Sequence, residues 1–235
     1  MFFVRSFLLM GQSNMAGRGN FGEVPAIENS LCFMLRNGRW QQMGEPINPD
    51  RWWSIYNGVG LSASFADECA KHFGEEIGLI PCADGGSAIK EWQPGEALYD
   101  HAVFQAKLAK RSSKIAGILW HQGENDSYEE QDAELYHERF MNMFTTLKKD
   151  LDLPDDIPVL IGEIGDFVEF HDNGNCKYFR RINEILKQLS TELPGGAFVS
   201  AKGLCGQADN VHFDSKSYRE FGKRYFAEYL KVKRL

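Results

Sequence analysis

The chain has 235 residues, of which 43% are hydrophobic and 25% are charged, and its 26 basic and 33 acidic side chains give a formal net charge of −7. This balance is typical of a globular protein and excludes a disordered tail protein, a collagen-like chain and a coiled coil. The negative charge argues against a nucleic-acid or anionic-membrane partner, and no apolar run approaches the roughly 18 residues of a membrane-spanning helix.

The N-terminal stretch and the cysteines both bear on location. Arg5 interrupts the first apolar residues and no small-residue cleavage site follows, so we expect no secretory signal peptide. The five cysteines are odd in number, widely spaced and without a C-x-x-C pair, which indicates reduced thiols rather than disulfides or a zinc knuckle. We therefore expect a cytoplasmic protein with neither a metal nor another cofactor.

Along the chain, short apolar segments alternate with longer amphipathic ones. Short continuous apolar runs predict strands buried on both faces, and apolar side chains at i, i+4 spacing predict helices. In chain order we expect a strand at 3–10, a helix at 61–73, a strand at 77–83, a helix at 99–110, a strand at 115–120, a helix at 132–149, a strand at 157–164, a helix at 178–189, a strand at 197–201 and a helix at 217–230.

Strand–helix alternation of this kind is the pattern of a parallel sheet covered by helices. We predict one three-layer α/β/α sandwich domain over residues 1–235, with a five-stranded parallel sheet. The segment 20–58 breaks the alternation, because it is rich in Gly, Pro, Asn and Trp and contains no predicted element. A loop of this length inside a compact domain is more often functional than idle.

Three polar segments follow predicted strands. Residues 11–17 follow the first strand, 121–126 the third and 209–213 the fifth. Because ligands gather outside the carboxyl ends of the strands in an open parallel sheet, we expect a serine, an amide-rich turn and an Asp-x-x-His pair to meet there. A nucleophile, a base with its orienting carboxylate and donors for an oxyanion are the components of acyl transfer.

These segments resemble the SGNH hydrolase superfamily, and within it the carbohydrate esterase branch that includes acetylxylan esterases and the sialate O-acetylesterase domain. The motifs follow the family's order from the first strand to the last helix. They are Gly11-Gln12-Ser13-Asn14-Met15, Val59-Gly60 with Phe65-Ala66, Gly85-Gly86-Ser87-x-Ile89-x-x-Trp92, His121-Gln122-Gly123-Glu124 and Asp209-x-x-His212. The resemblance implies the flavodoxin-like SGNH fold and a serine esterase that needs no metal.

The resemblance assigns the nucleophile to Ser13, whereas an arbitrary serine at a strand-to-helix turn would more simply cap the helix. His212 is the candidate base and Asp209 its orienting carboxylate, because a separation of three residues brings both side chains together on one turn. Asp209 has the alternative of capping the last helix, although Asp214 and Ser215 are better placed for that cap.

For the oxyanion, the resemblance suggests the backbone N–H groups of Ser13 and Gly60 and one amide side chain of the third polar segment. Two patterns compete for that amide. The general SGNH pattern Gly-x-Asn-Asp points to Asn125, and the His-Gln-Gly-Glu of the carbohydrate esterase branch points to Gln122. We favour Gln122, since it leaves the strand first and has the longer side chain.

The candidate substrate contacts are aromatic and charged. Trp53 and Trp92 offer indole faces that suit sugar rings, with packing of the loop onto the domain as the alternative. Arg18 fits the carboxylate of an acidic sugar or, equally, supports the adjacent glycine turn. Glu124 is a further candidate contact, and with His121 it lacks a third ligand for a metal. We expect His121 to be structural.

The sequence therefore predicts a serine esterase that removes acetyl groups from an acetylated carbohydrate and releases acetate. A lipase-like or thioesterase-like SGNH hydrolase is the first alternative, and the polar, tryptophan-bearing segment 20–58 argues against it. A non-catalytic sugar-binding module on the same scaffold is the second, and the presence of both the serine and the histidine argues against that. The choice among xylan, sialate and other acetylated sugars stays open, as does the oligomeric state.

Overall fold

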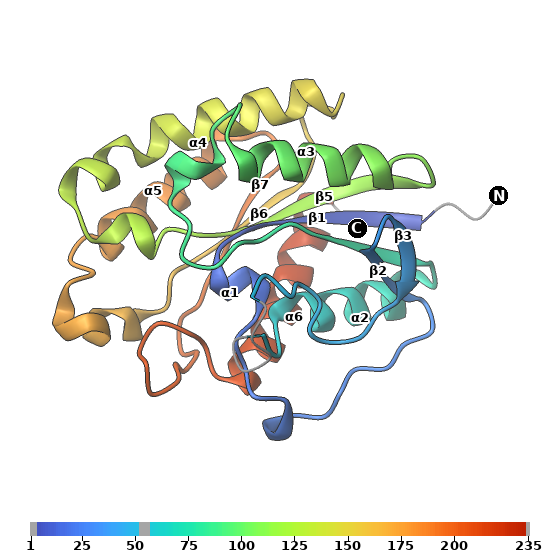
Figure 1. Ribbon diagram of the computed structural model, residues 1–235, viewed down its shortest axis with the longest axis horizontal. Coiled ribbons are helices and arrows are strands. Elements are labelled where there is room, and N and C mark those ends of the chain that lie inside the picture. The colour runs from blue at the N-terminus through green and yellow to red at the C-terminus, as the bar shows by residue number, and fades with distance from the viewer. Residues whose placement is uncertain (1–3, 52–56, 234–235) are drawn as a thin grey trace.

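The computed structural model describes residues 4–51 and 57–233, and these contain a seven-stranded sheet with helices on both faces (Figure 1). The strand order is β3-β2-β4-β1-β5-β6-β7, and every neighbouring pair is parallel except β2 and β3. The strands are β1 (Val4–Gly11), β2 (Cys32–Arg36), β3 (Arg39–Gln42), β4 (Ile77–Pro81), β5 (Ser113–His121), β6 (Val159–Gly162) and β7 (Gly196–Val199).

The sheet has seven strands, not the predicted five. The two additional strands, β2 and β3, form an antiparallel hairpin inside the segment 20–58, and β2 extends the parallel sheet beside β4. The dipeptide Asn37-Gly38 is the signal for this hairpin, because both residues adopt positive φ (51° and 74°), as a tight turn between two strands requires. The five predicted strands all occur where they were expected, as β1, β4, β5, β6 and β7.

All five predicted helices are present, with ends that shift by a few residues. They are α2 (Leu61–Phe73), α3 (Ala97–Ala109), α4 (Glu130–Asp150), α5 (Phe179–Glu192) and α6 (Ser215–Lys233), and a further short helix, α1 (Ser13–Ala16), follows β1 directly. In α2, Leu61, Phe65 and Cys69 recur at i, i+4 spacing and are buried, as the apolar face predicts. Gly74 ends α2 in the left-handed region with φ 65°.

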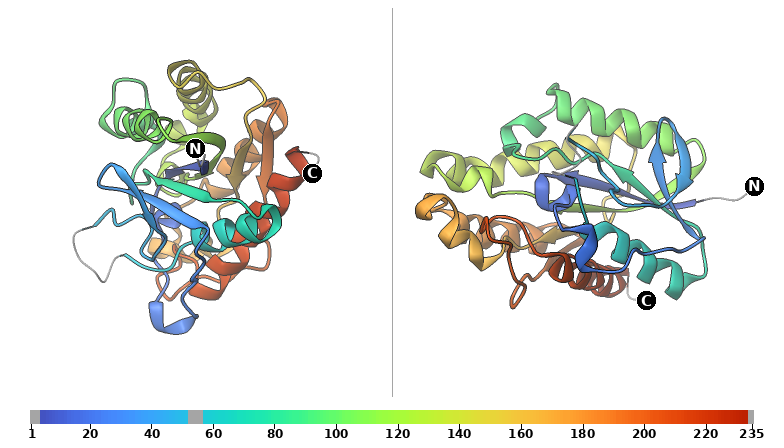
Figure 2. Two further views of the ribbon diagram at one scale, coloured as in Figure 1. Left: turned by 90° about the vertical axis from the view of Figure 1, so that its right-hand side faces the viewer. Right: turned by 60° about the horizontal axis from the view of Figure 1, so that its bottom comes forward.

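Two apolar cores lie on the two faces of the sheet, and the views in Figure 2 show the helical layers that cover them. Helices α3, α4 and α5 pack over one face, where Trp120 of β5 contacts Phe140 of α4 edge-to-face at 5.5 Å between ring centroids. Helices α2 and α6 pack over the other face, where Phe7 of β1 contacts Phe65 of α2 at 4.8 Å. The sheet is therefore buried on both sides, which explains the continuously apolar strands.

The strand order brings two of the polar segments together. The chain places β4 on one side of β1 and then crosses over to place β5 on the other side. The crevice between the carboxyl ends of β1 and β5 is the point at which strand order reverses, where such sheets bind ligands. Gly11 pairs with His121 there, and a Cβ atom on Gly11 would lie 2.1 Å from the His121 carbonyl oxygen. Only glycine allows this approach.

Candidate active site

Ser13, His212 and Asp209 form a hydrogen-bonded chain at the carboxyl ends of the strands. Ser13 Oγ lies 2.9 Å from His212 Nε2, and His212 Nδ1 lies 2.7 Å from Asp209 Oδ2. Ser13 begins α1 directly after the central strand, whereas His212 and Asp209 belong to the loop between β7 and α6. The sheet thus places side chains that are 199 residues apart in contact.

Asp209 is held as a carboxylate. Burial alone would raise the pKa of this carboxyl, but hydrogen bonds from His212 Nδ1 and from the backbone N–H groups of Val211 and His212, the latter two at 3.0 Å, keep its pKa well below the usual range. An ionised Asp209 accepts a hydrogen bond from the Nδ1–H of His212, which leaves the Nε2 lone pair facing Ser13 Oγ. The cap of α6 is Asp214, whose Oδ1 accepts the Ser217 N–H at 2.7 Å, so Asp209 is not used for that purpose.

A cavity of about 370 Å³ opens over this chain of side chains, and we call it the carboxyl-end cavity. It receives residues from every polar segment that follows a strand and from the segment 20–58. Its lining comprises Gln12, Ser13, Arg18, Arg51, Gly85, Gly86, Glu124, Asn125, Tyr128, His171, Val211 and His212. Hydrogen-bonding side chains and backbone therefore surround Ser13 on most sides.

Gln12 is a site residue that the sequence reading did not assign. Its Oε1 accepts hydrogen bonds from Gln122 Nε2 at 3.2 Å and from the Asn125 backbone N–H at 3.3 Å. Its Nε2 has no acceptor among residues 4–51 and 57–233, and Gln12 lines the cavity. The Gln12 amide is therefore held in place through its oxygen, and its N–H groups are available for hydrogen bonding. Its position directly before Ser13 was the available signal.

Gln122 does not lie where the prediction placed it. The side chain is 0% exposed, and its Nε2 donates to Asp126 Oδ2 at 2.6 Å, to the Ser87 carbonyl at 3.0 Å and to Gln12. Burial raises the pKa of Asp126 to about 6 despite this contact. Because the two N–H groups of Gln122 are already engaged inside the protein, this residue supports Gln12 rather than reaching the cavity. Asn125 is exposed and lines it.

Gly60 is also engaged elsewhere. Its N–H donates to Glu45 Oε1 at 3.0 Å, and the Glu45 carboxylate is paired with Arg219. Gly60 also packs closely on backbone, since a Cβ atom there would lie 3.3 Å from the Gly17 Cα. The glycines that line the cavity are Gly85 and Gly86. The Gly86 N–H has no acceptor within the described chain, whereas the Gly85 N–H donates to Asp50.

Arg18 lines the cavity, but its guanidinium group is paired within the protein. Its side chain is buried in an ion pair with Asp50 at 2.6 Å and donates to the Gly17 carbonyl at 3.0 Å. The alternative reading, a support for the glycine turn, is the one that the contacts fit. Since Asp50 Oδ2 also accepts the Gly85 N–H at 2.7 Å, the pair ties the turn after α1 to the loop that carries Gly86.

Of the two tryptophans predicted to contact sugar, only Trp92 belongs to the described residues. Trp92 is fully buried, packs edge-to-face on Trp120 at 5.7 Å and donates from Nε1 to Ser87 Oγ at 3.0 Å. It is a core residue, not a sugar platform, because no face of its indole reaches the cavity. Trp53 lies outside the described residues.

Glu124 and His121 are buried behind Ser13. Glu124 Oε1 accepts the Asn14 Nδ2 hydrogen bond at 2.6 Å and lies 3.6 Å from His121 Nδ1. His121 is structural, as expected, since its Nε2 lies 3.2 Å from the Glu163 carbonyl and burial lowers its pKa. Glu124 belongs to the lining of the cavity but is only 2% exposed, and its Oε1 is paired with Asn14, so its role as a substrate contact stays a prediction.

Neither a metal-binding cluster nor a membrane-spanning helix occurs in the described residues. No group of three or more His, Cys, Asp or Glu side chains in residues 4–51 and 57–233 is arranged to hold a metal ion. Over the same ranges, every helix is too short or too polar to cross a lipid bilayer.

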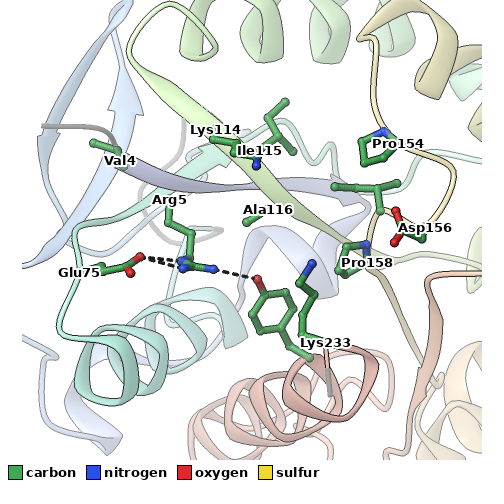
Figure 3. Close-up of a pocket in the computed structure, with 12 residues that line it drawn as sticks. Val4, Arg5, Glu75, Lys114, Ile115, Ala116, Pro154, Asp156, Pro158 and Lys233 are labelled. Carbon is green, nitrogen blue, oxygen red and sulfur yellow. Dashed lines mark hydrogen bonds and ion pairs between the residues drawn. The ribbon is translucent and has the colours of Figure 1, made fainter. Parts of the chain in front are cut away.

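A second cavity, of about 330 Å³, lies at the amino ends of the strands and is called the amino-end cavity (Figure 3). Its walls are formed by Val4, Arg5, Glu75, Lys114, Ile115, Ala116, Pro154, Asp156, Ile157, Pro158, Tyr229 and Lys233. Figure 3 shows Arg5 held by Glu75, at 2.9 Å. These walls offer charges and apolar surface, but they hold no serine or cysteine beside a histidine.

Comparison with known proteins gives a consistent result. A family model described as carbohydrate esterase, sialic acid-specific acetylesterase matches residues 4–231. A probable carbohydrate esterase of Arabidopsis thaliana is 31% identical, over 95% of this chain and 89% of its own length. Its X-ray structure superposes with a TM-score of 0.85, at 31% identity, over 97% of this chain and 98% of that one.

Two more distant structures share the fold. The crystal structure of NanS has a TM-score of 0.80 and 16% identity, with 99% of this chain and 98% of that chain covered. The crystal structure of a carbohydrate acetylesterase from Xanthomonas citri has a TM-score of 0.72 and 19% identity, with 97% of this chain and 56% of that chain covered.

Proposed function

The chain belongs to the carbohydrate esterase family described as sialic acid-specific acetylesterases, and we propose that it hydrolyses O-acetyl esters on carbohydrate hydroxyl groups with Ser13 as the nucleophile. The observation that carries the proposal is the hydrogen-bonded chain from Ser13 through His212 to Asp209 on the wall of the carboxyl-end cavity. A serine hydroxyl attacks an ester only when a base takes its proton, and His212 Nε2 is within reach of it.

In the acylation step, Ser13 Oγ attacks the acetyl carbonyl carbon while its proton passes to His212 Nε2. The ionised Asp209 stabilises the imidazolium that forms. When the tetrahedral intermediate collapses, the bond to the sugar oxygen breaks, and that oxygen takes the proton from His212. The acetyl group is then bound to Ser13 and the free sugar hydroxyl leaves.

Water completes the reaction by the same route. His212 Nε2 removes a proton from a water molecule, whose oxygen attacks the acetyl carbonyl of the acyl-enzyme. Collapse of the second intermediate releases acetate and returns the proton from His212 to Ser13 Oγ. No metal or other cofactor is needed in this scheme, since the nucleophile and the base are both side chains of the protein.

Three N–H groups are proposed to stabilise the oxyanion. The Ser13 N–H is at the first position of α1, where no carbonyl of the helix precedes it. Gly86 and Gln12 line the cavity, and the Gly86 N–H and Gln12 Nε2 have no acceptor among the described residues. These two replace Gly60 and Gln122 in the scheme, because the latter donate to Glu45 and to buried acceptors. Donors of this kind act most strongly on the charge that develops in the transition state.

The lining of the cavity favours a small acyl group on a polar leaving group. Among its described residues, Val211 carries the one aliphatic side chain, and Gln12, Arg51, Asn125 and His171 carry hydrogen-bonding groups. Sugar hydroxyls can use such groups, whereas a long acyl chain needs continuous apolar surface. We therefore place carbohydrate acetyl esters ahead of lipids and acyl thioesters as substrates.

The test is acetate release from acetylated xylo-oligosaccharides, O-acetylated sialic acid and long-chain acyl esters under one set of conditions. We expect turnover of at least one acetylated sugar and little of the long-chain esters. Ser13→Ala is the matched control, because alanine fits the same turn and removes only the hydroxyl. Faster hydrolysis of the long-chain esters would contradict the substrate assignment. Binding of acetylated sugars without acetate release by the folded wild type would instead indicate a sugar-binding module.

A further inference from the structure

Asn14 and Glu124 form a buried pair behind the nucleophile that the scheme above does not use. We propose that they are positioning residues for His212, in that Asn14 clamps the backbone on both sides of the histidine and Glu124 fixes the orientation of the Asn14 amide. This inference rests on the proposed function, since it concerns the geometry between Ser13 and its base.

The clamp consists of two hydrogen bonds to the residues that flank His212. Asn14 Nδ2 donates to the Val211 carbonyl at 2.9 Å, and the Phe213 N–H donates to Asn14 Oδ1 at 3.3 Å. Because Asn14 follows Ser13 directly in α1, one buried amide connects the nucleophile's helix to the loop that carries the base. The distance between Ser13 Oγ and His212 Nε2 is therefore set partly through Asn14.

Two further contacts fix which end of the amide faces which neighbour. Tyr218 Oη donates to Asn14 Oδ1 at 2.6 Å, and Glu124 Oε1 accepts from Asn14 Nδ2 at 2.6 Å. A flipped amide would set Oδ1 against the Glu124 carboxylate and the Val211 carbonyl, and Nδ2 against the Phe213 N–H. Acceptors would then face acceptors, and a donor would face a donor. Glu124 thus selects the orientation in which the clamp works.

The loop needs such a clamp because it is exposed. The Asp209 side chain is 43% exposed and that of His212 is 21% exposed, so solvent and thermal motion act on both. Glu124, in contrast, is buried, and its Oε2 has no hydrogen-bond partner in the described part of the chain. An uncompensated buried carboxylate oxygen costs stability, so a role in packing alone does not account for it.

Asn14→Asp is the primary test, because it keeps the shape and the acceptors but removes the donor to Val211 and sets two carboxylates together. We expect kcat for an acetyl ester to fall by about 10²-fold, the scale on which misplacement of about 1 Å acts, with KM changed less than about threefold. An unchanged kcat in a folded Asn14→Asp variant would overturn the proposal. If that variant does not fold, Tyr218→Phe removes one contact to Asn14 and should give a smaller loss in kcat.

A compensating substitution separates positioning from packing. In the double variant Asn14→Asp with Glu124→Gln, the glutamine Nε2 can donate to the aspartate, which again orients the group that faces Phe213. We expect the double variant to recover at least about tenfold in kcat over Asn14→Asp. Recovery of thermal stability without recovery of kcat would overturn the positioning role.

Asn183 provides a matched control, because it makes the same kind of clamp on the backbone of Ile164, with both hydrogen bonds at 2.9 Å. Asn183→Asp should lower stability while leaving kcat within about twofold. Ser13→Ala shows whether a negative result concerns the proposed function or only the positioning role of Asn14. If Ser13→Ala retains activity, the proposed function is wrong. If it is inactive while Asn14→Asp is fully active, the proposed function stands and the positioning role is wrong.

Discussion

The two ends of the sheet carry cavities of similar volume, about 370 Å³ at the carboxyl ends and about 330 Å³ at the amino ends, but they hold charge differently. In the amino-end cavity, the Arg5–Glu75 ion pair is 27% and 52% exposed. Beside the carboxyl-end cavity, the Arg18–Asp50 pair is 8% and 2% exposed and ties together two loops that flank Ser13. Volume alone therefore does not identify a site, whereas buried, hydrogen-bonded polar groups around a nucleophile do.

If the carboxyl-end cavity is the active site, the largest loss of turnover should come from substitution of Ser13. We expect Ser13→Ala to fold normally and to lose on the order of 10⁴-fold or more in kcat for an acetyl ester, and His212→Ala to be nearly as severe. Asp209→Ala should be milder, because an orienting group is less essential than a base. Steady-state kinetics, with circular dichroism for folding, are the measurements. Substantial turnover by Ser13→Ala would remove the functional distinction between the two cavities.

The next effect concerns Gln12, whose side-chain amide is proposed to stabilise the oxyanion. Gln12→Ala should lower kcat by about 10²–10³-fold with little change in KM, since an oxyanion donor acts mainly in the transition state. Asn125→Ala should change kcat less than about tenfold, or 1.4 kcal/mol.

Gln122 acts in this scheme through Gln12, so it offers an internal check. Gln122→Ala alone should lower kcat, but in the Gln12→Ala background it should lower it no further. Additive losses in the double variant would mean that Gln122 contacts the substrate directly, as the sequence motif suggested, and that its buried position changes on binding.

Asp209 should make the free energy of unfolding of the protein depend on pH. Hydrogen bonds hold its pKa in the folded protein below its ordinary value of 3.8. The ionised carboxylate therefore stabilises the fold above that pH, and the contribution is lost as pH falls toward the depressed pKa. We expect Asp209→Asn to be less stable than the wild type at pH 7, and the difference to shrink below about pH 4. Urea unfolding from pH 7 to pH 3 measures this, and a difference that grows in acid would contradict it.

The smallest effect should come from the amino end. Arg5→Met removes an exposed ion pair, so we expect a loss of at most about 1 kcal/mol in the free energy of unfolding. Turnover of the acetyl ester should be unchanged within error, because Arg5 is at the opposite end of the sheet from Ser13. A clear fall in kcat would show that the amino-end cavity is coupled to the site.

The success and the errors of the sequence reading have separate physical causes. The apolar runs predicted the central strands, and the rule that ligands bind at carboxyl ends predicted that Ser13 and His212 would meet, which they do. The hairpin of β2 and β3 was missed although two signals marked it, the apolar run Cys32–Leu35 of β2 and the Asn37-Gly38 turn. The run is only four residues long, and β3, with the sequence Arg-Trp-Gln-Gln, has no apolar alternation that would predict a partner strand.

Two of the three predicted oxyanion donors have other hydrogen-bond partners in this structure. Gly60 and Gln122 have the right residue types, but their N–H groups are taken by Glu45 and Asp126. Of these partners, Glu45 lies 15 residues from Gly60 in the chain, so the pairing is not visible in the local motif. A motif identifies which residues are near a site, whereas tertiary hydrogen bonding decides which of their atoms remain available.

The separation of Ser13 and His212 by 199 residues has a consequence for synthesis. In the proposed mechanism the nucleophile follows β1, which is synthesised early, whereas the base lies between β7 and α6. We therefore expect a nascent chain to cleave an ester only after that segment has been made and α6 has packed against α2. Under the proposed function, the first burst of acetate release during translation or refolding should therefore report that α6 has packed onto the sheet.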